Sequence, residues 1–375
     1  MRSFLFLAGI GIVISLFSFI THFSDDHKTL EIGSPAPDFK LMGVDDRTYS
    51  LASFRDASVL VVIFTCNHCP TAQCYEDRII KMTAEYANKN VAVVAIMPND
   101  PQSLRLDELD FSDLGDSFAE MKIRAKEKKF NFPYLYDGDT EAVSRAYGPI
   151  ATPHVFVFDK ERKLRYEGRI DDTESPFKTP GETDAQNAID ALLSNREVEV
   201  KTTKVFGCSV KWSDKKDLVQ KSLQAWAKEP VHLTTIQKDG LDSITQNRSA
   251  KLFLLYLWST DSNISMQQFN EFVTINRMYR DRDFEFISIC MDGTGEREKI
   301  LRFLETQQAS NKNVLVSMDE KSELIKTLNS KWRGALPYTL LIEPGGKIVF
   351  TEEGTVNPAV LKKTIVENHL IGRYP

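Results

Sequence analysis

Cysteine and long uncharged segments are both scarce in this chain of 375 residues. Five cysteines are too few for a disulfide scaffold of the kind that small secreted domains use. The formal net charge of −6 indicates no basic surface, so the sequence predicts no nucleic-acid partner. The shares of hydrophobic residues (42%) and charged residues (27%) are ordinary for globular proteins. The length exceeds what a single core usually serves, which predicts two domains plus additional segments.

The one long stretch without charge lies at the N-terminus, between Phe4 and Phe23. Twenty residues at helical rise roughly cross a bilayer core, and Arg2 before the stretch with Asp25-Asp26 after it places the N-terminus inside. We therefore predict a membrane anchor within residues 1–28, and an exported protein that faces the periplasm or the extracellular side, where disulfides persist. A cleaved signal peptide, which would leave the protein periplasmic, is the alternative, although small residues at a cleavage site are not evident.

Two of the cysteines, Cys66 and Cys69, form the sequence Cys-Asn-His-Cys directly after the apolar run Val59–Phe64. This run predicts a buried strand that leads into a helix, whose free N–H groups and dipole favour a negative charge. We expect Cys66 to be exposed and more acidic than a free cysteine, and protonated His68 to stabilise its thiolate. Two cysteines with this spacing at a strand-to-helix junction indicate a redox-active pair.

Other roles for the cysteines have less support. A zinc site usually needs a second Cys/His pair, and Cys208 and Cys290 stand alone, so no metal and no cofactor are expected. A purely structural disulfide is the other alternative, but strained disulfides tend to be labile. Cys74 projects about 140° from Cys69 on a helix and is not expected to pair with it. The acidic stretch Pro98 to Asp113 lacks the ligand spacing of a calcium loop and predicts a solvated loop.

Further motifs around the pair resemble those of redoxins. Residues 31–41 are similar to the G-x-x-A-P-D-F-x-L opening of that family, and Ala151–His154 resembles the element whose cis-proline faces the cysteines. The similarity covers about residues 30–213, including Gly207–Trp212, and is to a thioredoxin-like subgroup of AhpC/TSA type that carries C-N-H-C. The resemblance implies a thioredoxin-like fold in which Thr152 and Pro153 shape the substrate-facing wall. A trans proline that caps a strand is the alternative.

The chain departs from related families at two points. The peroxidatic P-x-x-x-T-x-x-C motif is absent, and the buried Asp that thioredoxin carries six residues before its first cysteine is Leu60 here. Another group must move protons, and Glu76 is the candidate. Cys208 is a candidate accessory thiol that resolves a mixed disulfide or holds a partner, although an isolated cysteine is usually inert.

The second half repeats this plan without the thiols. A buried strand at Lys251–Thr260 precedes a helix at Met266–Tyr279, and a proline-led strand follows at Leu336–Ile342. The segment that begins at Trp258 resembles the W-A-T-W-C-G-P-C motif of membrane-tethered thioredoxins, with Ser262 and Ser265 in place of the cysteines. Hydroxyls cannot form a disulfide, so this half is predicted to be redox-inactive.

The sequence thus predicts an α/β protein of two tandem thioredoxin-like domains with central mixed sheets flanked by helices. The predicted parts are the N-terminal segment (1–28), the redoxin-like domain (29–200), a linker (201–230) and the second domain (231–375). The predicted activity is thiol–disulfide exchange: Cys66 attacks, Cys69 resolves, and the partners are protein or small thiol substrates with an electron donor or acceptor. A thiol-dependent peroxidase and a non-enzymatic module that binds extended peptides are the alternatives.

Overall fold

The computed structural model describes residues 28–317, 328–329 and 332–374. The predicted membrane segment, residues 4–23, lies outside these ranges. Among the described residues, no helix is both long enough and apolar enough to span a bilayer.

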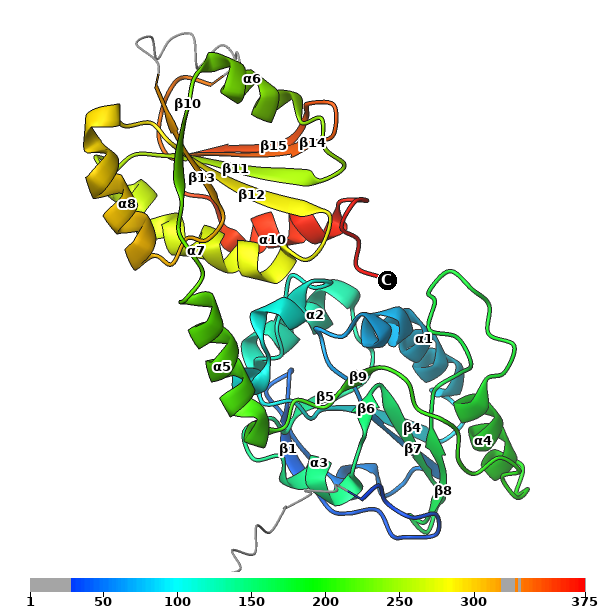
Figure 1. Ribbon diagram of the computed structural model, residues 1–375. Helices are drawn as coiled ribbons and strands as arrows, with labels where there is room; N and C mark the ends of the chain where they lie inside the picture. Colours follow the sequence, from blue (N-terminus) through cyan, green and yellow to red (C-terminus); the bar gives the residue numbers. More distant parts are fainter. Residues whose placement is uncertain (1–27, 318–327, 330–331, 375) are drawn as a thin grey trace, which may run out of the picture.

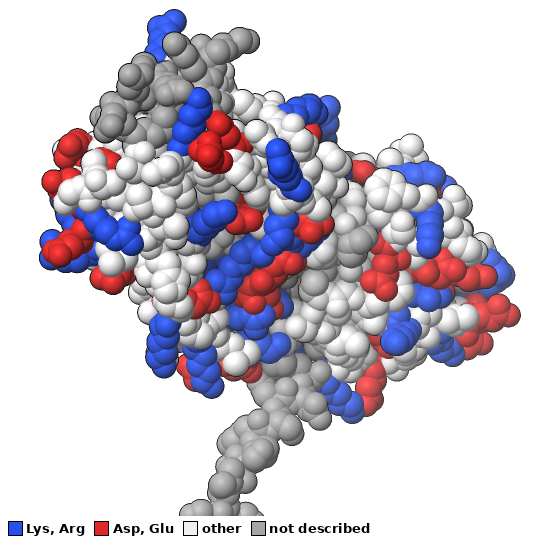
Figure 2. Space-filling view, turned by 45° about the horizontal axis from the view of Figure 1, so that its top comes forward, with Lys and Arg blue, Asp and Glu red and all other residues white. Residues whose placement is uncertain are grey.

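The chain forms two α/β units joined by helix α5 (Lys216–Trp226), each built on its own mixed sheet with helices against it (Figure 1). The thioredoxin-like α/β fold class predicted from the sequence is confirmed. On the face drawn in Figure 2, basic and acidic side chains are interspersed rather than gathered by sign.

The first sheet has seven strands in the order β2-β1-β5-β4-β3-β7-β8. Its centre is β3, whose six residues are all buried, with β4 parallel on one side and β7 antiparallel on the other. The strands are β1 (Lys40–Gly43), β2 (Thr48–Ser50), β3 (Val59–Phe64), β4 (Val91–Met97), β5 (Tyr134–Tyr136), β7 (His154–Phe158) and β8 (Leu164–Gly168).

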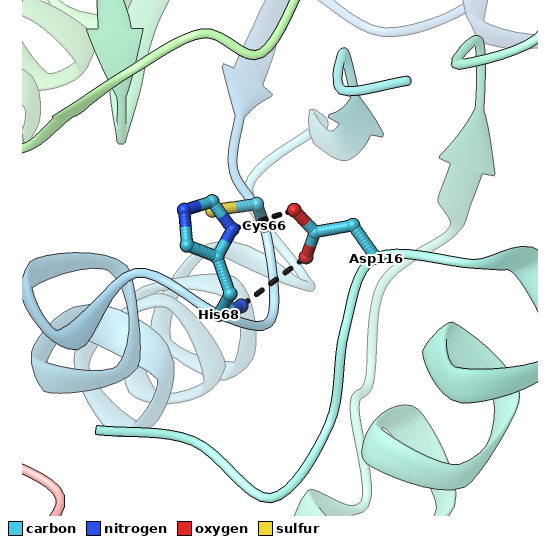
Figure 3. A group of neighbouring side chains, drawn as sticks. All are labelled: Cys66, His68 and Asp116. Atoms are coloured by element: carbon cyan, nitrogen blue, oxygen red, sulfur yellow. Dashed lines mark hydrogen bonds and ion pairs between the residues drawn. The ribbon is translucent and has the colours of Figure 1, made fainter. Parts of the chain in front are cut away.

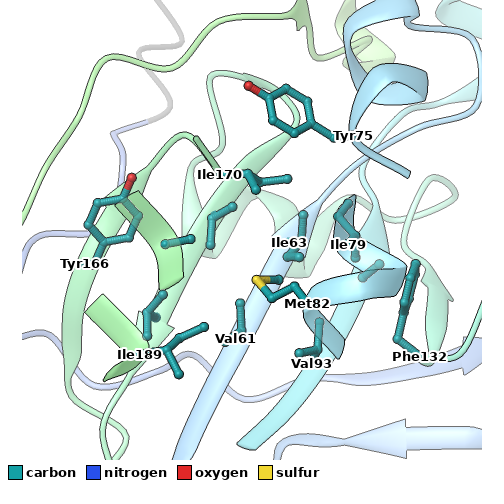
Figure 4. Close-up of a cluster of buried hydrophobic side chains, with 14 of the residues drawn as sticks. Val61, Ile63, Tyr75, Ile79, Met82, Val93, Phe132, Tyr166, Ile170 and Ile189 are labelled. Atoms are coloured by element: carbon teal, nitrogen blue, oxygen red, sulfur yellow. The ribbon is translucent and has the colours of Figure 1, made fainter. Parts of the chain in front are cut away.

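Both faces of this sheet are covered, which explains why β3 is a continuous apolar run. Alternate side chains point to opposite faces of a strand. Val61 and Ile63 of β3 pack among side chains from α1 and α4 (Figure 4), whereas Val62 and Phe64 face the opposite core with Tyr147 of α3. The helices of this unit are α1 (Pro70–Tyr86), α2 (Phe118–Lys128), α3 (Ala142–Tyr147) and α4 (Asp184–Leu193).

The second sheet has six strands in the order β10-β13-β12-β11-β14-β15. Its central strand β11 is buried along its whole length and lies between parallel β12 and antiparallel β14. The strands are β10 (Leu233–Ile236), β11 (Leu252–Trp258), β12 (Phe284–Cys290), β13 (Lys312–Val316), β14 (Tyr338–Glu343) and β15 (Lys347–Glu353). The helices are α6 (Lys238–Gln246), α7 (Asn263–Tyr279), α8 (Arg297–Thr306) and α10 (Pro358–Glu367).

The acidic stretch that was predicted to be a solvated loop is instead the contact between the two units. Leu106 and Leu109 pack against the core of the second unit, and Asp113 is paired with Arg373 at 2.6 Å. The hydroxyl of Tyr279 donates a 2.8 Å hydrogen bond to the carbonyl of Ser112. The prediction was wrong because the sequence does not show that a second unit packs against Leu106 and Leu109 and pairs with Asp113.

The predicted linker is also too long at its N-terminal end. Residues 208–209 form strand β9 (Cys208–Ser209), which pairs with β6 (Ala151–Thr152) of the first unit. Farther along, the Lys211 N–H donates to Asn99 Oδ1 at 2.9 Å. This part of the chain therefore belongs to the first unit, and only α5 bridges the two.

Candidate active site

The cysteine pair lies where strand β3 ends and helix α1 begins. Cys69 is the N-cap of α1 and Pro70 is its first residue, a position that suits proline because its missing N–H would have no partner there. The sequence predicted Cys66 at the start of this helix. The helix begins three residues later than that, so the terminus acts on Cys69.

Both sulfurs meet the residue before Pro153. Cys66 Sγ lies 3.0 Å from Thr152 Oγ1, and Cys69 Sγ donates to the Thr152 carbonyl at 3.3 Å. The Thr152-Pro153 peptide bond is cis, as the resemblance implied. Cys66 is 3% exposed and Cys69 is fully buried, so neither sulfur is as open as the sequence predicted for Cys66.

His68 is held by a carboxylate from a distant loop (Figure 3). His68 Nδ1 and Asp116 Oδ2 are 2.6 Å apart, and both groups are buried. The other carboxylate oxygen accepts the backbone N–H groups of Asn67 and His68, at 2.9 and 3.2 Å. Asn99 Nδ2 donates a further hydrogen bond to Asp116, at 2.7 Å. This network fixes the imidazole beside the cysteine pair.

Burial, hydrogen bonds and nearby charges shift the pKa values of the two thiols in opposite directions. Burial raises the pKa of Cys66 well above its usual range, and the hydrogen bond with Cys69 and the charge of Asp116 add to this. Burial alone would also raise the pKa of Cys69, but hydrogen bonds with Cys208 and Cys66 and the charge of His68 outweigh it and hold that pKa well below its usual range. The first proton that the pair loses therefore leaves the charge on Cys69, in contrast to the prediction for Cys66.

Asp116 also decides the charge of the imidazole. Burial alone would lower the pKa of His68, but the charge of Asp116 and its hydrogen bond outweigh burial and raise that pKa. The same contact, with Asn99 and the Asn67 N–H, outweighs burial at Asp116 and lowers the pKa of that carboxyl. These opposite shifts favour an imidazolium cation beside the Asp116 carboxylate, next to the more acidic of the two thiols.

Sequence reasoning missed Asp116 and Asn99. Asp116 lies 48 residues from His68 along the chain, three residues after the acidic stretch Pro98 to Asp113. The many carboxylates in and just after that stretch were the available signal, but nothing in their spacing singles out Asp116. Cys208, by contrast, was singled out, and its backbone N–H does reach Cys69 Sγ, at 3.3 Å.

Glu76, the candidate proton carrier, faces away from the sulfurs. Its carboxylate forms two 2.7 Å hydrogen bonds with the guanidinium of Arg124, and both side chains are buried. Burial raises the pKa of Glu76, although Arg124 opposes that shift. The group placed to move protons at the pair is His68.

Replacing Glu76 with Gln tests its assignment as a structural residue. The free energy of unfolding should fall by about 3 kcal/mol, because the charge of Arg124 is left buried without its partner. Disulfide reductase turnover of the folded protein should stay the same. Asp77→Asn is the matched control, since Asp77 is exposed and its pair with Lys128 should contribute under about 1 kcal/mol. If Glu76→Gln has the stability of the wild type but no turnover, Glu76 has a catalytic role after all.

One group of side chains has the proximity of a metal site. Ligand atoms of Cys66, His68 and Asp116 lie within 4.8 Å of one another, the one such group among the described residues. The carboxylate oxygens of Asp116 already accept hydrogen bonds from His68, Asn67 and Asn99. Only the Cys66 thiol and His68 Nε2 are then left in this group as ligands for a metal ion. Structural zinc sites use four ligands, so this donor set does not fit one.

Comparison with known proteins relates the first unit to a known family. Residues 31–188 match the family model of the redoxins. This match lies within the first unit, which resembles redoxins over these residues and is therefore named the redoxin domain. Alkyl hydroperoxide reductase E of Mycobacterium tuberculosis is 29% identical over 174 residues, which cover 44% of this chain and 97% of that protein.

Solved structures similar to the redoxin domain include two of unassigned activity. A hypothetical protein from Sinorhizobium meliloti is 32% identical, with a TM-score of 0.45. The match covers 50% of this chain and 97% of that protein. An uncharacterized conserved protein from Geobacillus kaustophilus is 34% identical, with a TM-score of 0.44. The match covers 49% of this chain and 93% of that protein.

Proposed function

We propose that the redoxin domain is a thiol–disulfide oxidoreductase that uses Cys66 and Cys69 on protein or small thiol substrates. The observation that carries this proposal is the contact of both sulfurs with Thr152, next to a cis proline and to the His68–Asp116 pair. Such a site has two thiols that can be oxidised together, a group that exchanges protons and an edge of backbone for an extended substrate.

The reaction begins with the proton that the two sulfurs share. Cys66 transfers its proton to the Cys69 thiolate and attacks a substrate disulfide, which forms a mixed disulfide with Cys66 and releases one substrate thiolate. Cys69 then gives its proton to the released substrate thiolate and attacks the Cys66 sulfur. The Cys66–Cys69 disulfide forms and the second substrate thiolate leaves, so the substrate gains two electrons and the pair loses two.

His68 supports both steps through its charge. As a cation it stabilises the thiolate of Cys69, and the carboxylate of Asp116 keeps it protonated. Imidazolium can also donate a proton to the leaving thiolate. The Cys66 sulfur is the one with residual exposure, which favours it as the atom that meets the substrate.

The second unit supports the redoxin domain without chemistry of its own in this proposal. Ser262 caps helix α7 by accepting the Ser265 N–H, and the two hydroxyls are hydrogen-bonded at 2.8 Å. Cys290 is fully buried, and burial raises its pKa. The unit contacts the loop that ends at Asp116, through Tyr279 and Arg373, and this contact holds the loop in place.

A thiol-dependent peroxidase is the second candidate. The curated relative is called an alkyl hydroperoxide reductase, and its match covers the redoxin domain. Neither Cys66 nor Cys69 has a threonine three residues before it, as the peroxidatic motif requires. This departure makes peroxidase activity the weaker proposal.

Reduction of insulin disulfides by the full chain tests the proposed function. With dithiothreitol as the donor, the wild type should reduce insulin and Cys66→Ser should not. Cys290→Ser is the matched control and should keep turnover within about twofold, because that thiol is buried in the second unit. Peroxide consumption that needs Cys66, without insulin reduction, would establish the peroxidase. Absence of both activities in the folded wild type would leave the non-enzymatic peptide-binding module.

We also propose that the protein is exported and anchored through residues 4–23. The support is the uncharged sequence between Arg2 and Asp25-Asp26. After alkaline carbonate washing of membranes, the intact chain should remain in the pellet. Recovery of a soluble chain that begins near residue 24 would identify a removed signal peptide instead.

A further inference from the structure

A segment of the chain itself covers the edge that faces the cysteine pair. Strand β9 runs antiparallel to β6, with Cys208 opposite Thr152 and Ser209 opposite Ala151. Gly207 permits this approach: its φ is +138°, and a Cβ there would lie 2.1 Å from the Thr152 carbonyl oxygen. Only glycine adopts this conformation so close to another backbone.

The segment is fastened on its C-terminal side. The N–H of Lys211 donates to Asn99 Oδ1 at 2.9 Å, and its carbonyl accepts the N–H of Asp100 at 2.9 Å. The ammonium group of Lys211 forms a 2.6 Å ion pair with Glu108. Asn99 also binds Asp116, so the segment and the His68 network share one support.

This arrangement brings a third thiol to the pair. The N–H of Cys208 donates to Cys69 Sγ at 3.3 Å. Cys66 instead makes its contact with Thr152 Oγ1. Cys69 therefore lies between two cysteines, and Cys208 is half-buried against it.

We propose that Cys208 is a third redox thiol, which exchanges with the Cys66–Cys69 disulfide to form a Cys69–Cys208 disulfide. This inference rests on the proposed function. In the exchange the Cys208 thiolate attacks the Cys69 sulfur, the Cys66–Cys69 bond breaks, and Cys66 leaves as a thiolate that takes up the proton lost by Cys208. The number of disulfides does not change, so no further oxidant is needed.

The exchange has a consequence for the reaction cycle. Once the disulfide moves to Cys69 and Cys208, Cys66 is a free thiol while the protein still holds two oxidising equivalents. Strand β9 is then tied covalently across the Thr152 edge. An extended substrate that adds a strand at that edge would have to displace β9, which is easier in the state where Cys208 is free.

The test maps disulfides in full-length Cys66→Ser. In a glutathione redox buffer that fully oxidises the wild type, Cys69 and Cys208 should form one disulfide per molecule, with oxidised glutathione as the electron acceptor. Samples are quenched with acid, alkylated and digested, and the linked peptides are identified by mass spectrometry. Wild type should yield both the Cys66–Cys69 and the Cys69–Cys208 peptides, whereas Cys208→Ser should yield only the first. Cys74→Ser is the matched control, because Cys74 is a buried thiol on the same helix, and should give the wild-type map.

The outcomes separate this inference from the proposed function. If Cys66→Ser keeps Cys69 and Cys208 as free thiols in the buffer that oxidises wild type, the third-thiol proposal is overturned, while normal insulin reduction by the wild type would leave the proposed function standing. A wild type that forms the disulfides but does not reduce insulin would overturn the proposed function instead. Circular dichroism of each variant shows that loss of a link is not loss of the fold.

Discussion

Cys69→Ser should turn the protein into a trap for its substrates. Cys66 can still attack a substrate disulfide in this variant, but a serine hydroxyl cannot resolve the mixed disulfide that results. Covalent complexes linked through Cys66 should accumulate. Cys66→Ser should trap none, because Cys69 is fully buried and would resolve any mixed disulfide formed at the neighbouring Cys208. Non-reducing gel electrophoresis followed by peptide mapping measures both results.

Two companion variants sharpen this experiment. Cys69→Ser combined with Cys208→Ser should trap at least as much as the single variant, since Cys208 contacts Cys69 and not the Cys66 sulfur. Trapping by Cys66→Ser at the level of Cys69→Ser would reverse the roles of the two cysteines. Complexes that persist after reduction would show that no disulfide is involved.

Asp116→Asn should lower turnover at neutral pH by about 100-fold, the usual contribution of a positioned acid–base group. The amide can still accept the N–H groups of Asn67 and His68, but it carries no charge. The pKa of His68 should fall, and the Cys69 thiolate should lose the cation that lowers its pKa. The pH profile of insulin reduction and an NMR titration of His68 measure these effects.

The sign of the pH dependence follows from the same ion pair. Because folding raises the pKa of His68 above 6.5, its stabilisation is fully present below 6.5 and is lost as the pH rises through the folded-state pKa. Folding lowers the pKa of Asp116, so its contribution is present above 3.8 and is lost as the pH falls through its lower folded-state pKa. The difference in unfolding free energy between wild type and Asp116→Asn should be largest between about pH 4 and 6.5.

Controls separate the ion pair from a general effect of charge. Asp107→Asn removes a carboxylate from the same loop, where it pairs with Arg105, and should leave turnover within about twofold. His68→Gln should lose as much turnover as Asp116→Asn, and the double variant no more, because the two act as one unit. Full additivity of the two losses would contradict the coupling seen in the structure.

The strands and the position of the cysteine pair could be predicted because their signals are local. Strand β3 has the bounds that the sequence predicted, since an unbroken run of apolar residues can bury both faces only in a covered sheet. The cis proline at Thr152-Pro153 and the position of Cys66 and Cys69 after β3 follow from motifs of a few residues each. Short strands such as β5 and β13 were not predicted, because their few residues carry too weak a pattern.

By itself, the sequence determined the fold class and the identity of the two cysteines, because both depend on residues adjacent in the chain. Only the tertiary structure decided which carboxylate serves His68, since Asp116, rather than Glu76, is brought there by a loop 48 residues away. It also decided which thiol is acidic, because the pKa of Cys69 depends on contacts with Cys208 and His68 and on a helix that starts at Pro70. Charges and hydrogen bonds act through space, and burial strengthens them, so their partners can be identified only after the chain has folded.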